Sequence, residues 1–176
     1  MLDLCSGAGY LGLIVAHRTH RRAVLVDREP AACRWAKENA ARAGLVDQVE
    51  VRCAPLEHAV AANERFSIVI ADPPYIPTAE VAHYGEDPPS GIDGGVDGLT
   101  VARRCVSLIA ACLSDAGSAL IQLRTTGQAR ELVSGLPSGL RCARIASFEH
   151  GTLVRLTPVG CEADATDEPW LPAVGG

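Results

Sequence analysis

A carboxylate followed by two prolines and a tyrosine ends one apolar run of this 176-residue sequence. The run Ser67–Ala71 leads directly into Asp72-Pro73-Pro74-Tyr75 and then Ile76-Pro77. Two consecutive prolines fix φ and lack N–H groups, so the turn presents mainly hydrogen-bond acceptors. That surface suits a planar NH2 group, because Asp72 can accept one N–H and the Pro73 carbonyl the other, while Tyr75 stacks on the planar face.

Such a pair of acceptors would assist a reaction at nitrogen. The lone pair of an amide or aromatic amine nitrogen is delocalised, which makes the atom a poor nucleophile. Accepting both hydrogens aligns the nitrogen and stabilises the positive charge that develops on it. Each charge-assisted hydrogen bond contributes roughly 1.5–3 kcal/mol. We therefore expect the catalytic residues to be Asp72, Pro73, Pro74 and Tyr75.

A glycine-rich turn, Asp3–Gly12, lies near the start of the chain between a strand pattern and a helical pattern. Glycines allow the backbone to approach a ligand, and the helix N-terminus that follows offers free N–H groups and a positive dipole end. Asp27 stands at the end of the next expected strand, where a carboxylate can accept ribose hydroxyls. The turn and Asp27 together favour a cofactor that contains a nucleoside.

Gly7, Gly9 and Gly12 also satisfy the G-x-G-x-x-G pattern, so the literal match supports NAD as well. Asp3 favours another cofactor, since a carboxylate beside the turn would repel a pyrophosphate and attract an ammonium or sulfonium group. We therefore expect S-adenosyl-L-methionine. The alternatives are that Asp3 caps a nearby helix and that Asp27 is a solvated strand-end carboxylate. The residues expected to bind the cofactor are Asp3, Cys5, Ser6, Gly7, Gly9, Tyr10, Asp27, Arg28, Ala54, Pro55 and Asp72.

Short apolar runs alternate with helical patterns along the chain, which is typical of βα units on a parallel sheet. The expected strands are Met1–Leu4, Ala23–Val26, Val49–Cys53, Ser67–Ala71, Ser118–Leu123, Cys142–Phe148 and Thr152–Thr157. The expected helices are Gly9–His17, Pro30–Ala43, Leu99–Leu113 and Ala129–Ser134. The turn Glu149-His150-Gly151 predicts that the last two strands form an antiparallel hairpin at one edge.

Two segments interrupt this alternation. Pro73–Gly98 is rich in proline, glycine and aspartate, and we interpret it as a substrate loop. Gly160–Gly176 is polar and aperiodic, so we expect a loosely ordered tail in which Trp170 is a candidate anchor. The sequence thus predicts one catalytic domain over residues 1–159 and a tail over residues 160–176.

Composition limits the classes of function. The chain is 48% hydrophobic, enough for one domain with a real core, and its net charge of −5 argues against a general nucleic-acid binder. Seven scattered cysteines without a C-x-x-C pair indicate reduced thiols rather than a zinc site. Neither a signal peptide nor an apolar run of membrane-spanning length occurs. We therefore expect a soluble, cytoplasmic protein without a metal.

With both motifs in place, the sequence resembles class I methyltransferases of the HemK/PrmC type, which methylate the N5 atom of glutamine in release factors. The resemblance spans about Leu2–Leu123 and rests on Asp3–Gly9, on Asp72–Pro77 and on Gly94–Leu99, which is similar to a GG-x-DGL stretch of that family. It implies a Rossmann-like α/β fold, with a mostly parallel seven-stranded sheet, an antiparallel edge hairpin and helices on both faces. It also implies a release-factor-like protein substrate.

Four departures from the family pattern keep other substrates open. Asp72 replaces the usual asparagine, as is common in adenine-N6 and guanine-N2 methyltransferases, so a nucleic-acid base or a small molecule is an alternative acceptor. Cys5 replaces the first glycine, and Pro55 replaces an acid that meets the adenine amine, so adenine contacts come from the backbone or are lost. The chain also begins at the first strand instead of a helical domain, which indicates a different substrate, a shorter relative or a misassigned start.

The sequence also leaves open whether the protein forms a homodimer. A non-catalytic module and an NAD-binding protein on the same fold are the remoter alternatives.

Overall fold

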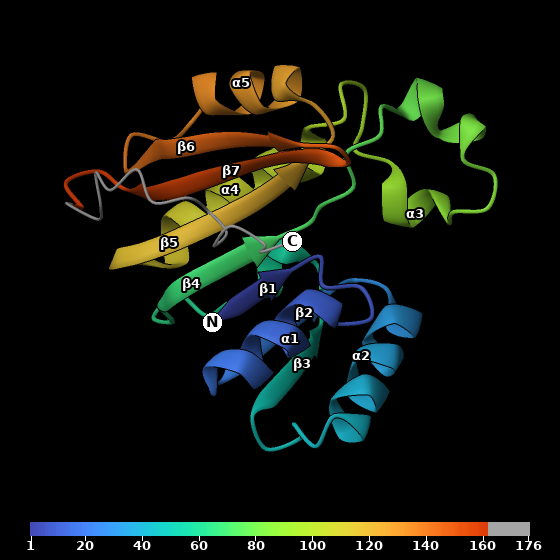
Figure 1. Ribbon diagram of the computed structural model, residues 1–176, viewed down its shortest axis with the longest axis vertical. Helices are drawn as coiled ribbons and strands as arrows, with labels where there is room; N and C mark the ends of the chain where they lie inside the picture. The colour runs from blue at the N-terminus through green and yellow to red at the C-terminus, as the bar shows by residue number, and fades with distance from the viewer. Residues whose placement is uncertain (162–176) are drawn as a thin grey trace, which may run out of the picture.

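The computed structural model describes residues 1–161, which form a seven-stranded sheet with helices packed against it (Figure 1). The strand order is β3-β2-β1-β4-β5-β7-β6. The strands are β1 Leu2–Leu4, β2 Ala23–Asp27, β3 Val49–Cys53, β4 Phe66–Ala71, β5 Leu113–Leu123, β6 Leu140–Phe148 and β7 Gly151–Pro158. All pairings among β1 to β5 are parallel, and β7 runs antiparallel to both β5 and β6. The expected α/β fold with an antiparallel edge hairpin is confirmed.

The helices are α1 Tyr10–Thr19, α2 Pro30–Arg42, α3 Pro89–Ile92, α4 Thr100–Cys112 and α5 Thr126–Ser134, with the 3-10 turns η1 Leu56–His58 and η2 Thr78–His83. The helices α1, α2, α4 and α5 occur where the sequence predicts helices, whereas α3 and the two 3-10 turns were not predicted. Pro30 occupies the first turn of α2, and Gly44 follows that helix at φ +69°. A left-handed residue at this place is a common way to end a helix.

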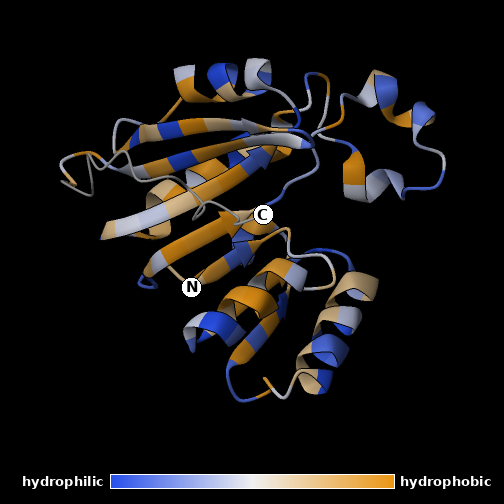
Figure 2. Cartoon of the chain, viewed as in Figure 1, coloured by the Kyte–Doolittle hydropathy of each residue, from blue (hydrophilic) through white to orange (hydrophobic). Residues whose placement is uncertain are grey.

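Apolar side chains on the two faces of the sheet form two separate core clusters. One cluster joins α1 and α2 to Leu25 of β2, and the other joins α4 and α5 to β1, β4, β5 and β7. Successive residues of a strand point to opposite faces, so Leu25 and Val26 belong to different clusters. Figure 2 shows β4, in the middle of the sheet, as an almost continuous apolar strand. A strand covered on both faces is expected to look this way.

The expected substrate loop over Pro73–Gly98 is more ordered than a plain loop. It contains η2 and α3, and Ile76 forms a parallel bridge with Asp93. The Ile76 N–H donates to the Ile92 carbonyl at 2.9 Å, and the Gly94 N–H donates to the Ile76 carbonyl at 2.8 Å. These bonds hold the start of the segment, at Ile76, next to its end, at Ile92 and Gly94, so the segment forms a loop whose two ends are joined.

The predicted tail over residues 160–176, with Trp170 as its candidate anchor, falls almost entirely outside the described residues, which end at Cys161. The proposed boundary between a catalytic domain and a tail therefore stays a prediction. Within residues 1–161, no helix is both long and apolar enough to cross a membrane.

Gly12 lies in α1 and supports a test of how tightly this helix packs on the sheet. A Cβ atom there would stand 2.7 Å from Asp3 Oδ2 and 2.9 Å from Leu25 Cδ1. We expect Gly12→Ala to lower the free energy of unfolding by about 1–3 kcal/mol, the usual cost of overpacking. Urea denaturation measures the change.

Gly127 in α5 is the matched control, because its Cβ would come no closer than 3.6 Å to Thr125 Oγ1. Gly127→Ala should raise the free energy of unfolding by about 0.5–1 kcal/mol, since alanine suits a helix better than glycine. Equal effects of the two substitutions would contradict the close packing at Gly12.

Candidate active site

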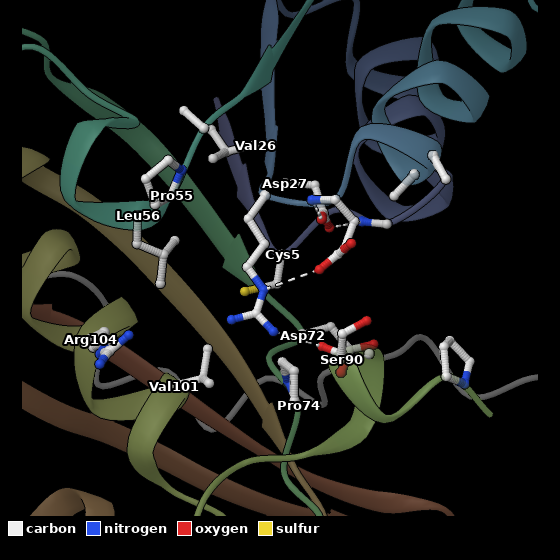
Figure 3. A pocket seen from close by; sticks show the side chains of 18 of the residues that line it. Cys5, Val26, Asp27, Pro55, Leu56, Asp72, Pro74, Ser90, Val101 and Arg104 are labelled. Atoms are coloured by element: carbon white, nitrogen blue, oxygen red, sulfur yellow. Dashed lines mark hydrogen bonds and ion pairs between the residues drawn. The ribbon is translucent and has the colours of Figure 1, made fainter. Parts of the chain in front are cut away.

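A cavity of about 410 Å³ opens beyond the carboxyl ends of β1, β2, β3 and β4 (Figure 3). Its size is that of a pocket for a small molecule or cofactor. Segments that are distant in sequence line it together: the glycine turn, the end of β2, the start of α2, the segment after β3, the Asp-Pro-Pro turn, α3 and α4. Ligands in open α/β folds bind at this edge of the sheet.

The glycine turn has a left-handed backbone at three positions: Cys5 at φ +58°, Gly7 at φ +53° and Gly9 at φ +87°. A Cβ on Gly9 would lie 2.8 Å from Leu25 Cδ2, whereas one on Gly7 would meet nothing within 4 Å. Gly9 is therefore needed for packing, and Gly7 leaves the cavity wall open. Cys5 holds a conformation that costs a residue with a side chain roughly 1–2 kcal/mol, which explains why glycine suits this position.

Asp27 ties the glycine turn to the start of α2. Its Oδ2 accepts the Gly7 N–H at 2.8 Å, and its Oδ1 accepts the Glu29 N–H at 2.9 Å. The side chain also lines the cavity. Each carboxylate oxygen can accept more than one hydrogen bond, so both keep capacity for a ligand. The position predicted for a ribose-binding acid is thus held rigidly at the cavity wall.

Asp3 is placed differently from the prediction. Its side chain is buried, its Oδ2 accepts the Gly12 N–H at 2.9 Å, and it is not among the residues that line the cavity. Gly12 carries one of the first-turn amides that find no partner within a helix. The contact is therefore the helix-capping one considered as the alternative for Asp3. A role beside the ammonium group of a cofactor stays a prediction.

Burial raises the pKa of Asp3 from 3.8 to about 7, the Gly12 N–H opposes the rise, and the charges of Asp72 and Asp27 add to it. Between these two values the folded state holds a proton that the unfolded state has lost. The contribution of Asp3 to the free energy of unfolding should therefore fall as pH increases from about 4 to about 7. We expect Asp3→Asn to remove this part of the pH dependence.

Urea denaturation of both proteins at several pH values in this range measures the effect. The difference between the two should widen steadily in favour of Asp3→Asn as pH rises. A constant difference would contradict the assignment of the titration to Asp3.

The Asp72–Tyr75 turn leaves β4 and brings two of its residues to the cavity, Asp72 and Pro74. Burial raises the pKa of Asp72 above its usual range, which makes its carboxylate a better proton acceptor. Pro73 is buried, and Tyr75 is half-buried and does not line the cavity. The pKa of the Tyr75 phenol is raised by burial and by the charge of Asp72, while a hydrogen bond with Gln122 opposes the rise.

The Gly94–Leu99 stretch packs directly on this turn. A Cβ on Gly94 would lie 2.7 Å from the Pro74 carbonyl oxygen, and one on Gly98 would collide with the Tyr75 carbonyl. The Gln128 side chain donates to the same Tyr75 carbonyl at 2.9 Å. The two glycines therefore allow a close backbone approach that fixes the turn, which gives a physical reason why both motifs occur in one chain.

The structure brings seven of the eleven residues predicted to bind the cofactor to the cavity wall. These are Cys5, Gly7, Asp27, Arg28, Ala54, Pro55 and Asp72. The other four do not line it: Asp3, Ser6, Gly9 and Tyr10, of which Tyr10 is 70% exposed. Ser6 Oγ is buried and has no hydrogen-bond partner among the described residues. The assignment of all these residues to a cofactor remains a prediction.

Eleven further lining residues were not predicted from the sequence. They are Val26, Glu29, Ala31, Ala32, Leu56, Glu57, Pro88, Ser90, Gly91, Val101 and Arg104. The first four lie close to Asp27 in the sequence, at the end of β2 and the start of α2. The expected helix that begins just after this cofactor-binding acid could therefore have indicated them. Pro88, Ser90 and Gly91 lie in the expected substrate loop, and Arg28 fixes that loop by donating to the Ser90 carbonyl at 3.2 Å. Nothing in the sequence around Val101 and Arg104 indicates that they line the cavity.

Comparisons with known sequences show that this chain is similar to glutamine methyltransferases. A family model described as Conserved hypothetical protein 95 matches residues 1–83. The release factor glutamine methyltransferase of Mycolicibacterium smegmatis is 36% identical over 139 residues, which is 74% of this chain and 47% of that protein. That of Rhodospirillum rubrum is 32% identical over 81% of this chain and 45% of that protein. The ribosomal protein uL3 glutamine methyltransferase of Bradyrhizobium diazoefficiens is 31% identical over 76% and 42%. The chain thus spans about half the length of these curated relatives.

Comparisons with solved structures show the same fold. An RNA methyltransferase from Salinibacter ruber in complex with S-adenosyl-L-homocysteine superimposes with a TM-score of 0.61 at 18% identity, covering 94% of this chain and 85% of that one. TrmN from Thermus thermophilus superimposes with a TM-score of 0.67 at 15% identity, covering 90% and 43%. At this level of identity the likeness establishes the fold alone.

Proposed function

Since this chain belongs to the family of HemK/PrmC-type glutamine methyltransferases, we propose that it transfers a methyl group from S-adenosylmethionine to the side-chain amide of a protein glutamine. The observation that carries the proposal is the single cavity shared by the glycine turn, Asp27 and Asp72 (Figure 3). Methyl transfer to an NH2 group brings cofactor and acceptor together, and one cavity with both Asp27 and Asp72 on its wall supports that arrangement.

The residues of the cavity fit this cofactor. Gly7 leaves its part of the wall open, and Asp27 is fixed there by two backbone amides. The cofactor would supply an electrophilic methyl group on a cationic sulfur. The sulfur–methyl bond breaks as the new carbon–nitrogen bond forms, and the rest of the cofactor becomes a neutral thioether.

The chain's own residues would hold the acceptor nitrogen and take up its charge. Asp72, which lines the cavity, would accept one N–H. The residue types predict the Pro73 carbonyl as the second acceptor, although Pro73 is buried and is not among the residues that line the cavity. Positive charge that grows on the nitrogen is stabilised by the Asp72 carboxylate. The proton lost after transfer moves to Asp72, whose pKa is raised by burial. No deprotonation has to precede the transfer.

Methylation of a nucleic-acid base is the second candidate, and Asp72 is the observation that favours it. A carboxylate accepts hydrogen bonds from an exocyclic amine as well as from an amide. The net charge of −5 counts against a polyanionic substrate. The glutamine relatives and the Gly94–Leu99 stretch support the amide, so we keep the base as the alternative.

Calorimetry with S-adenosylhomocysteine and with NAD tests the cofactor assignment. We expect S-adenosylhomocysteine to bind with measurable affinity and NAD to show no heat of binding at the same concentrations. The NAD pyrophosphate would face the negative charges of Asp27 and Asp72 in a cavity where both line the wall. Binding of NAD alone would contradict the proposal.

A further inference from the structure

One side of the cavity carries an apolar wall with an ion pair beside it. Val26 belongs to one core cluster, Leu56 and Val101 pack against it, and the three line the cavity from β2, η1 and α4. Figure 3 shows Pro55, Leu56, Val101 and Arg104 along this side, with Ser90 on the other. Aliphatic side chains grouped in this way form a suitable wall for a planar heterocycle.

The ion pair consists of Glu57 of η1 and Arg104 of α4. Arg104 Nη1 lies 3.6 Å from Glu57 Oε1, and both residues line the cavity. Their side chains are 59% and 56% exposed, so the pair stands at the rim. A separation of 3.6 Å is too long for a direct hydrogen bond. The carboxylate therefore keeps an acceptor, and the guanidinium a donor, for a third group.

An acceptor beside a donor matches one particular heterocycle edge. Adenine presents the N1 acceptor next to the N6 amine donor on its Watson–Crick edge, whereas hypoxanthine presents an N1–H donor next to an O6 acceptor. A ribose bound by Asp27, as the proposed function requires, would lie beside Val26, the residue that precedes Asp27 in β2. A base joined to that ribose would share the cavity with Leu56 and Val101, which line it together with Asp27.

We propose that Glu57 and Arg104 select the adenine of the cofactor, Glu57 by accepting an N6–H and Arg104 by donating to N1. The inference rests on the proposed function, since it assigns the base of the same cofactor. It also answers how adenine is recognised where Pro55 offers neither a donor nor an acceptor in its side chain. The acidic group comes from η1, two residues further along the chain.

Calorimetry with S-adenosylhomocysteine and S-inosylhomocysteine tests the pair, because the second ligand reverses donor and acceptor on the base. We expect the wild-type protein to bind S-adenosylhomocysteine about tenfold or more tightly, the value of one well-made hydrogen bond to a charged group. Glu57→Gln should reduce this preference to about threefold or less, since the glutamine amide can turn and donate to O6. Arg104→Gln should act in the same direction, because glutamine can accept the N1–H.

Glu149→Gln is the matched control, as Glu149 lies in the turn between β6 and β7 and is absent from the cavity wall. It should leave the wild-type preference unchanged. Full retention of the preference in both Glu57→Gln and Arg104→Gln would overturn the inference and leave the proposed function intact. A wild-type protein that binds neither ligand would overturn both.

Discussion

Replacing Asp72 by alanine is expected to lower the rate of methyl transfer about 10²–10³-fold, the usual effect of removing one preorganised group that stabilises transition-state charge. Asp72 lies at the cavity on a turn that two prolines and the close packing of Gly94 hold in place. The proposed function gives Asp72 its main contact with the acceptor nitrogen, so the affinity for S-adenosylhomocysteine should change less than about threefold. Single-turnover rates and calorimetry on the same preparation measure the two quantities.

Asp72→Asn is the matched control, since the asparagine oxygen can still accept an N–H but carries no charge. We expect it to recover a large part of the activity lost in Asp72→Ala. A loss of cofactor affinity equal to the loss of rate in Asp72→Ala would show that Asp72 serves the cofactor instead of the acceptor.

Replacing Asp27 by alanine should have its largest effect on cofactor affinity. Two charge-assisted hydrogen bonds to ribose hydroxyls amount to about 3–6 kcal/mol, which corresponds to a rise in the dissociation constant of about 10²–10⁴-fold. Part of the loss would come from the glycine turn, because the Gly7 and Glu29 amides lose their acceptor. Calorimetry with S-adenosylhomocysteine gives the dissociation constant.

Asp27→Asn separates these two effects. It keeps one oxygen acceptor for a backbone amide, so the turn should be disturbed less while one of the two ribose contacts is lost. We expect an affinity between those of the wild type and Asp27→Ala. Unchanged affinity in Asp27→Ala would show that the ribose does not lie at the end of β2.

The elements of the fold could be predicted from the sequence because each has a strong local signal. The period of 3.6 and the flanking Pro30 and Gly44 define α2 to within one residue of Pro30–Arg42. The strand β5 is the weakest case, since it begins at Leu113 and the polar stretch before Ser118 hides its first residues. The two short turns in the substrate loop also escaped prediction, because one or two turns of helix give no periodic pattern.

A place on the cavity wall was predictable where a residue ends a strand, as Asp27 does, or follows one directly, as Asp72 does. It was less predictable where tertiary packing decides. The burial of Asp3 and its bond to the Gly12 amide depend on how α1 packs against β1. The sequence pattern of a carboxylate beside a glycine turn is the same whether the side chain faces the cavity or caps the helix. Arg104 reaches the cavity because α4 packs against η1, two elements more than forty residues apart in the chain.

The central claim is best tested by mass spectrometry after incubation of the protein with isotopically labelled S-adenosylmethionine and a release factor. The account predicts one labelled methyl group on the side-chain nitrogen of a glutamine, in wild-type protein and not in Asp72→Ala. Parallel incubation with RNA should give no labelled base. Label on an RNA base with none on the release factor would contradict the glutamine assignment.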